Sequence, residues 1–262
     1  MRAWVQDQAG FGLGYVEQLY TFGDRFRDPR EDLENLRAVT VAYLALVKEA
    51  PLSGTANASW VPWYHFFPWE DWRDGSPDLL HKQIIPGLNG WVAQGHDQKC
   101  QNARRERVEI AFGLGGSTWD LVRVLERYEL LYEANLIDEG LGAKHESSIP
   151  SLAMVLDHRR ILATAMGRLR GKLSYRPMVF ELLPSTFTLL QLQRVVEALS
   201  GVRIHKQNFR RLVDKAGLVE RTGKFDHQTG GRPAALFSFR REVLRERASS
   251  GVGLPGLSHR EG

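Results

Sequence analysis

The most regular pattern of apolar and polar positions lies in the last third of the chain. From Thr188 onward, apolar residues recur at the spacing of one helix face. These positions are Leu192, Val195, Val196 and Leu199. A break at Ser200-Gly201 follows, and a second amphipathic stripe runs from Lys206 to Ala216. Thr188 suits the N-cap of the first helix, and Gly217 suits the C-terminal cap of the second. The pattern therefore predicts two short helices joined by a tight turn.

Two stretches of strand-forming residues follow the second predicted helix, Leu218–Arg221 and Ala235–Phe239. The connection between them is rich in glycine and ends in Gly231-Arg232-Pro233, which predicts a hairpin, or wing. Helix, turn, helix and hairpin together predict a winged helix-turn-helix domain over residues 184–247. Residues 248–262 carry little apolar surface, so we expect a disordered tail.

The outer face of the second predicted helix combines cations with amides. Cations contact phosphates, and amides can read adenine edges in a major groove. A basic helix face on its own is usually just solvated, but its place between a turn and a basic wing favours nucleic-acid binding. The predicted DNA contacts are Thr188, Lys206, Gln207, Asn208, Arg210, Arg211, Lys215, Lys224 and Arg232.

The net charge of +4 hides an asymmetry along the chain. Residues 184–247 hold 13 Lys and Arg against 6 Asp and Glu, whereas residues 1–183 hold 21 against 24. This division favours a polyanion-binding module attached to a domain with another role. The single cysteine, Cys100, excludes an internal disulfide and a cysteine-based zinc cluster, and we expect no metal site. Neither a run of eighteen apolar residues nor a signal peptide is present, which predicts a cytoplasmic protein.

The first part of the chain has a mixed pattern. Strand-forming residues at 15–22 and 38–47 predict two strands, while prolines in a third candidate, 60–67, favour an edge or loop there. Helical periodicity returns over 118–138 and again from His158 to Leu169. The fold class predicted is α+β, with an N-terminal domain at 1–150, a linker helix region at 151–183 and the winged helix domain.

Several sequence blocks resemble the Nudix-related transcriptional regulators of NAD metabolism, the NrtR and NadQ types. They are Gln18–Asp24, Asp28–Arg30, Val41–Leu44, Leu169–Leu173, Phe180–Pro184, Asn208–Arg211 and Gly231–Ala234. Two further blocks, 68–72 and 125–133, resemble the NadQ branch in particular. The resemblance implies a repressor of NAD biosynthesis or salvage genes that binds a palindromic operator as a homodimer. It also implies an effector such as ADP-ribose, NAD or ATP, and no required cofactor.

By this resemblance, residues 1–150 are a degenerate, truncated Nudix-like α/β domain with a helical extension, which senses the effector and dimerises. The catalytic box of Nudix hydrolases holds Mg²⁺ through several carboxylates. Here the matching positions carry Ala3, Trp4 and Asp7-Gln8, so one carboxylate of three survives and we expect no enzymatic activity. Two alternatives are a nucleotide pyrophosphohydrolase for an ADP-ribose-like substrate with an accessory winged helix, and a protein-docking module.

The expected effector site lies in the most distinctive N-terminal block of the family. An aromatic side chain beside two arginines could stack an adenine and bind phosphates. The alternative is that the two aromatic residues belong to the strand core. The predicted effector-binding residues are Tyr20, Phe22, Asp24, Arg27 and Arg30.

Overall fold

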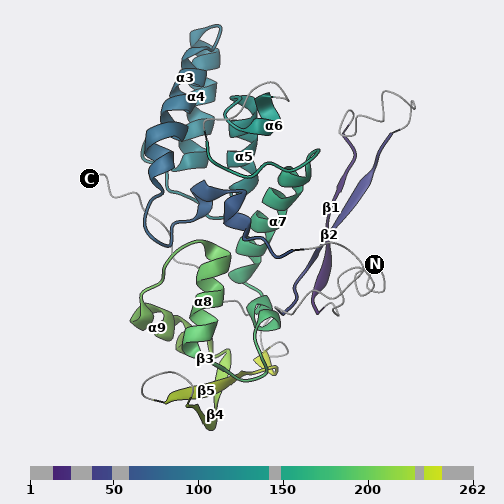
Figure 1. The fold of residues 1–262 in the computed structure, drawn as a ribbon. Helices are drawn as coiled ribbons and strands as arrows, with labels where there is room; N and C mark the ends of the chain where they lie inside the picture. The colour runs from purple at the N-terminus through teal and green to yellow at the C-terminus, as the bar shows by residue number, and fades with distance from the viewer. Residues whose placement is uncertain (1–13, 25–36, 49–58, 142–148, 228–232, 244–262) are drawn as a thin grey trace. The chain divides into compact units, whose positions relative to one another are not determined.

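The computed structural model describes residues 14–24, 37–48, 59–141, 149–227 and 233–243 (Figure 1). The chain divides into two compact units. The first takes in the described residues of 1–18, 43–60 and 169–255, and the second takes in those of 19–42 and 61–168. Helix and sheet are both present, as the predicted fold class requires.

The two strands predicted near the N-terminus are confirmed as β1 (Val16–Phe22) and β2 (Thr40–Ala45), which form a two-stranded sheet. Leu19 and Phe22 are buried, whereas Tyr20 is exposed. The third candidate, residues 60–67, is not a strand. Residues 60–62 have no regular structure, and the 3-10 helices η1 (Trp63–His65) and η2 (Pro68–Glu70) follow, in keeping with the prolines at 62 and 68.

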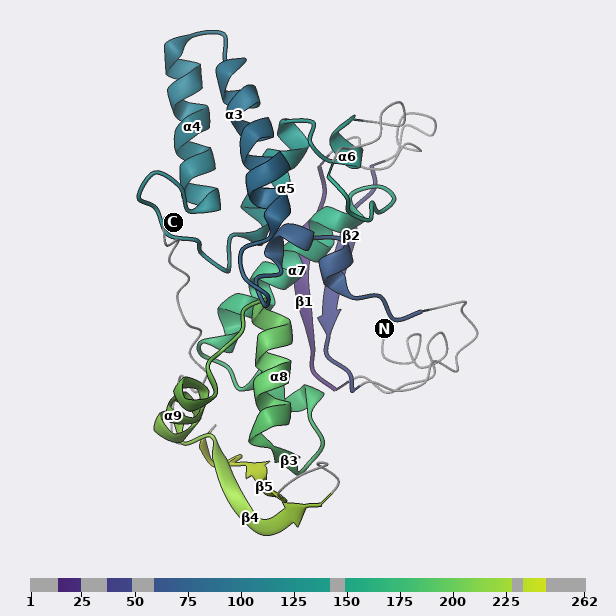
Figure 2. The ribbon, with the colours of Figure 1, turned by 60° about the vertical axis from the view of Figure 1, so that its left-hand side comes forward.

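Helices make up most of the described part of the second unit. A π-helical turn, η3 (Leu80–Ile84), continues directly into α3 (Ile85–Ala93), and α4 (Gln98–Phe112) lies beside α3 in both ribbon views (Figures 1 and 2). Asp97 caps α4 by accepting a hydrogen bond from the Cys100 N–H at 2.6 Å, and Gly113 ends it with a φ of 65°. Both ends of α4 are thus set by local sequence.

The helix predicted over 118–138 is shorter than its periodicity suggests. The structure forms α5 (Val124–Glu133) and α6 (Asp138–Leu141), while the Asp120 carboxylate accepts a hydrogen bond from the Val122 N–H at 3.0 Å in a turn before α5. This local bond offers the backbone an alternative to the helix. The next helix, α7 (His158–Leu173), confirms the periodicity from His158 to Leu169 and passes from the second unit into the first.

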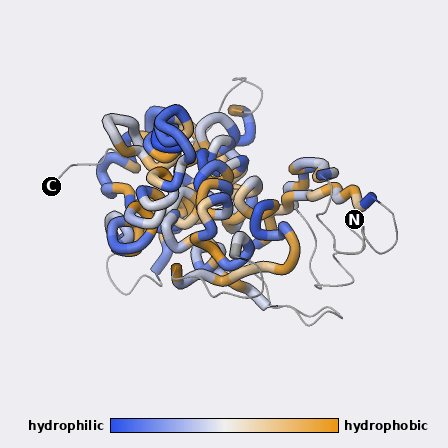
Figure 3. Tube along the Cα trace, turned by 90° about the horizontal axis from the view of Figure 1, so that it is seen from above, coloured by the Kyte–Doolittle hydropathy of each residue, from blue (hydrophilic) through white to orange (hydrophobic). Residues whose placement is uncertain are grey.

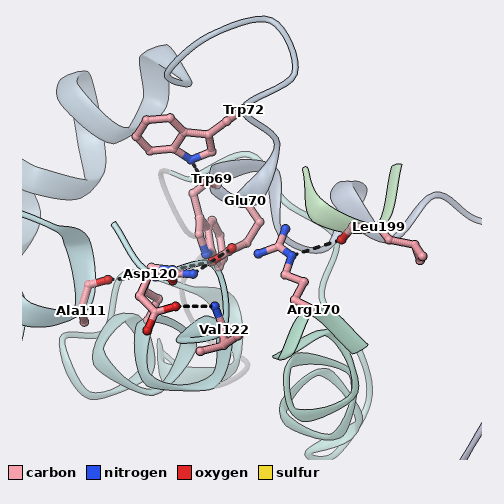
Figure 4. A network of polar contacts seen from close by, with 9 residues as sticks. Trp69, Glu70, Trp72, Ala111, Asp120, Val122, Arg170 and Leu199 are labelled. Carbon is pink, nitrogen blue, oxygen red and sulfur yellow. Dashed lines mark hydrogen bonds and ion pairs between the residues drawn. The ribbon is translucent and has the colours of Figure 1, made fainter. Parts of the chain in front are cut away.

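Buried arginines hold the core of the second unit together. The Arg127 guanidinium on α5 donates to Glu70 and to the carbonyl oxygens of Ala111 and Asp120 (Figure 4). The Arg159 guanidinium on α7 lies over three aromatic rings, those of Phe67, Trp69 and Tyr128. Its Nη1 atom lies 3.0 Å from a carboxylate oxygen of Glu139. These charges are tolerated in the interior because carboxylates and carbonyl oxygens satisfy them.

The last third confirms the predicted order of elements closely. After η4 (Met178–Leu182) come β3 (Phe187–Thr188), α8 (Leu189–Ser200), α9 (Lys206–Ala216), β4 (Val219–Asp226) and β5 (Ala234–Phe239). The three strands form an antiparallel sheet in the order β3-β5-β4. Seen from above, the helical coils of the described chain carry both hydrophobic residues, in orange, and hydrophilic residues, in blue (Figure 3). This arrangement is a winged helix-turn-helix.

Candidate nucleic-acid interface

A small polar network fixes the turn between α8 and α9. The Gln193 amide donates to the Ile204 carbonyl at 2.8 Å and to the Glu197 carboxylate at 2.9 Å. The same carboxylate accepts the Ile204 N–H at 2.8 Å, and Gly201 adopts the left-handed conformation, with a φ of 77°, that ends α8. Because both polar groups of Ile204 are engaged by side chains of α8, α9 starts from a fixed position relative to α8.

The start of α8 is fixed by a capping box between Thr188 and Gln191. The Thr188 hydroxyl accepts the Gln191 N–H at 3.2 Å, and the Gln191 side chain accepts the Thr188 N–H at 2.7 Å. Thr188, predicted as both N-cap and DNA contact, is confirmed as the cap. Only 6% of its surface is exposed, which leaves little of the side chain accessible to DNA. The DNA contact of Thr188 stays a prediction.

The outer face of α9 presents the predicted cations and amides to solvent. Phe209 and Val213 are fully buried and anchor the inner face. Within this exposed face, the Arg211 guanidinium donates to the Asn208 side-chain oxygen at 2.8 Å. The pair therefore presents a guanidinium and an amide in one fixed arrangement. The exposed members of the face are Lys206, Gln207, Asn208, Arg210, Arg211, Asp214 and Lys215.

The wing strand β4 is interrupted by a bulge. Arg221 pairs with Phe237 and Phe225 with Ala235, so three residues of β4 oppose a single residue of β5. Gly223 takes a φ of 75°, which favours glycine, and the Thr222 hydroxyl donates to the Leu236 carbonyl at 3.0 Å. Lys224, a predicted contact, is exposed in this bulge, whereas Arg232 lies outside the described residues.

A groove of about 830 Å³ lies between the start of α8, the face of α9 and the β4–β5 hairpin. Lys206 and Arg210 reach it from α9, and Arg221 reaches it from β4. Phe225 and Asp214 also line it, and neither was predicted to have a role. Arg221 and Phe225 were missed because a bulge decides which face of β4 they occupy, and no periodic pattern marks a bulge.

The predicted effector residues are only partly brought together. Phe22 is buried, which favours the strand-core alternative for that ring, whereas Tyr20 is 58% exposed and meets the Phe22 ring edge-on at 5.1 Å. Asp24 pairs at 3.1 Å with Arg160, which also pairs with Glu129 at 2.8 Å. Arg27 and Arg30 lie outside the described residues. Arg160 was not singled out from the sequence because it lies 136 positions from Asp24.

Another polar cluster joins β1 to the end of α7. Lys172 and Tyr15 both bond to the Glu17 carboxylate, and Lys172 also donates to the Tyr15 hydroxyl oxygen at 3.0 Å. Burial acts to lower the pKa of Lys172, but the bonds with Glu17 and Tyr15 outweigh it, so the pKa is raised. This ion pair connects the block Leu169–Leu173 with Glu17, the residue directly before the block Gln18–Asp24.

Two general features of the described residues bear on function. Within residues 14–24, 37–48, 59–141, 149–227 and 233–243, no helix is both long and apolar enough to cross a bilayer. In the same ranges, no group of three or more His, Cys, Asp or Glu side chains is placed to hold a metal ion.

Two sequence comparisons with known proteins each match only part of the chain. Residues 179–239 match the NrtR DNA-binding winged helix domain. The ADPR responsive transcriptional repressor NtrR of Acinetobacter baylyi is 36% identical over 88 residues, which cover 34% of this chain and 35% of that protein. The chain is thus matched over about a third of the length of this curated relative.

Solved structures resemble the chain more distantly. Shewanella oneidensis NrtR complexed with a 27mer DNA is 21% identical, with a TM-score of 0.48 and coverage of 98% of this chain and 77% of that one. A MutT/nudix family protein from Enterococcus faecalis is 19% identical, with a TM-score of 0.44 and coverage of 91% and 66%. At the level of sequence, the match is to the NrtR DNA-binding winged helix domain, over residues 179–239.

Proposed function

We propose that this protein is a transcriptional repressor that binds operator DNA through α9 and the wing. The observation that carries the proposal is the exposed face of α9, where Asn208 and Arg211 form one hydrogen-bonded pair amid cations. A guanidinium can read guanine and an amide can read adenine in a major groove, while the surrounding lysines and arginines neutralise phosphates. The match of residues 179–239 to a DNA-binding domain family supports the same conclusion.

The finer features of the proposal concern assembly and control. One recognition helix reads only a few base pairs, so we propose a homodimer on a palindromic operator, with half-sites about one turn of B-DNA apart. The effector proposed is an NAD-related nucleotide, with ADP-ribose ahead of NAD and ATP because the Acinetobacter relative is described as ADPR responsive. The target genes would be those of NAD biosynthesis or salvage. The protein would act in the cytoplasm.

The part of the chain outside the winged helix is proposed as a sensor without enzymatic activity. The Nudix-box positions Ala3, Trp4 and Asp7-Gln8 supply one carboxylate, and Mg²⁺ is held by several oxygen ligands. The competing function is hydrolysis of an ADP-ribose-like pyrophosphate. Incubation with ADP-ribose and Mg²⁺, followed by separation of the nucleotides, distinguishes the two, since turnover would favour the hydrolase.

Fluorescence anisotropy tests the DNA-binding proposal directly. The purified protein is titrated onto labelled promoter fragments of NAD-synthesis genes and onto random DNA, with ADP-ribose, NAD and ATP added in turn. Arg211→Ala should lower the preference for the promoter fragment. Arg105→Ala, a change at an exposed arginine of α4, should leave it unchanged and serves as the matched control. Equal binding of all DNAs by the unaltered protein would contradict an operator-specific repressor.

A further inference from the structure

The wing strand carries an exposed aromatic residue in basic surroundings. Phe225 is 56% exposed, although it lies in a strand of the three-stranded sheet. Single exposed apolar residues are common, so the exposure alone indicates no role. What distinguishes Phe225 is its place in the groove that also receives Lys206, Arg210 and Arg221.

The bulge in β4 holds Phe225 in that groove. Between the paired residues Arg221 and Phe225, β4 has two residues more than β5 has between Phe237 and Ala235. Because two is an even number, Arg221 and Phe225 remain on the same face of the sheet, and both line the groove. Hydrogen bonds of the Thr222 hydroxyl with the Leu236 carbonyl and the Lys224 N–H fix the bulge. The exposed position of the ring is therefore built into the hairpin.

The chemistry of the groove fits one occupant, the backbone of duplex DNA. Three cations reach it from two elements, and they complement a row of phosphates. A phenyl ring carries no charge and no hydrogen-bond donor for a phosphate, but it can pack on the apolar carbons of the sugar between two phosphates. We propose that Phe225 packs on a deoxyribose of the DNA strand that occupies this groove. This inference rests on the proposed function, since it requires that the domain binds DNA.

A sugar contact has a signature that separates it from the contacts of the cations. It displaces no counterion, so its loss weakens binding equally at every salt concentration and leaves the salt slope unchanged. It also carries no base preference, so operator and random DNA weaken alike. From the apolar surface of a phenyl ring, Phe225→Ala should weaken both by about fivefold, and Phe225→Leu by about twofold.

The test measures anisotropy from 50 to 200 mM salt for the full chain, on a promoter fragment and on random DNA. Arg221→Ala provides the electrostatic comparison and should lower the salt slope by about one. Tyr132→Ala, at an exposed aromatic residue of α5, is the matched control and should bind as the unaltered protein does. Thermal melts followed by circular dichroism confirm that each variant is folded.

Each outcome either supports the sugar contact of Phe225 or overturns it. Parallel loss on both DNAs with an unchanged slope for Phe225→Ala supports the sugar contact. Unaltered binding by this variant overturns it, and so does a change of slope. A loss confined to the promoter fragment would indicate a base contact, for example with a thymine methyl group, and would also overturn it. If the unaltered protein binds neither DNA, the proposed function itself fails, and that result is distinct from all the others.

Discussion

Replacing Glu70 by Gln removes one charge from the most buried ion pair that the structure describes. The Glu70 and Arg127 side chains have no exposed surface, and their two hydrogen bonds measure 2.6 and 3.0 Å. The same guanidinium donates to the carbonyls of Ala111 and Asp120, each at 2.9 Å (Figure 4). It also lies 4.0 Å from the centre of the Trp119 ring. Arg127 therefore stays in place after the change, and its charge loses a counterion.

The expected cost follows from that geometry. Glutamine keeps the size of glutamate, so packing is preserved and the electrostatic effect dominates. Leaving one charge of a buried pair uncompensated destabilises a protein by about 3–5 kcal/mol. Glu126→Gln is the matched control, because Glu126 is adjacent to Arg127 on α5, pairs with Arg123 at 2.5 Å and has a side chain that is 53% exposed. An exposed pair of this kind contributes about 0–1 kcal/mol.

Urea unfolding followed by tryptophan fluorescence measures both variants. Five of the seven tryptophans, among them Trp69, Trp72 and Trp119, belong to the second unit, and the sequence has no tryptophan after residue 119, so the signal reports mainly on the second unit. We expect a large shift of the midpoint for Glu70→Gln and almost none for Glu126→Gln. A change below about 1 kcal/mol for Glu70→Gln, or equal changes for the two, would refute the argument from burial.

Three further predictions concern the winged helix, and the first two are tested by anisotropy titration. Asn208→Ala and Arg211→Ala should each reduce the preference for operator over random DNA, whereas Lys224→Ala should weaken both and lower the salt slope; a uniform loss from all three would contradict this division. Asp214→Asn should strengthen binding to both DNAs, and more so at low salt, because a carboxylate in the groove repels phosphates. Thr188→Ala should cost about 1 kcal/mol through loss of the cap, measured by thermal unfolding under circular dichroism, and an unchanged melt would contradict it.

The winged helix could be predicted from sequence because its determinants are local. The stripe of α8, its capping threonine and the glycine that follows α9 lie within a few residues of the features they set. The predicted bounds of α9, Lys206 and Ala216, are those observed. For β4 the prediction begins one residue early and ends five residues short, because the bulge interrupts the alternation on which the prediction depends. For β5 it begins one residue late.

The core of the second unit could not be predicted in the same way. Arg127 follows Glu126 and stands two positions before Glu129, so its sequence context resembles that of an ordinary exposed residue. Its partner Glu70 lies 57 positions earlier in a 3-10 helix. No local pattern distinguishes an arginine that will be buried from one that will be solvated, because the difference arises from partners brought close by tertiary structure.

This distinction also changes how the charge count is understood. In the second unit, arginines such as Arg127, Arg159 and Arg107 pair with carboxylates, so their charges are compensated within the fold. Among the residues that the structure describes, Lys206 and Arg210 on α9 form no ion pair. A polyanion is attracted most by cations that no carboxylate compensates. The winged helix therefore attracts a polyanion more strongly than its excess of lysines and arginines over acidic residues suggests. The salt dependence of DNA binding should accordingly follow changes in α9 and be insensitive to neutralising Arg107.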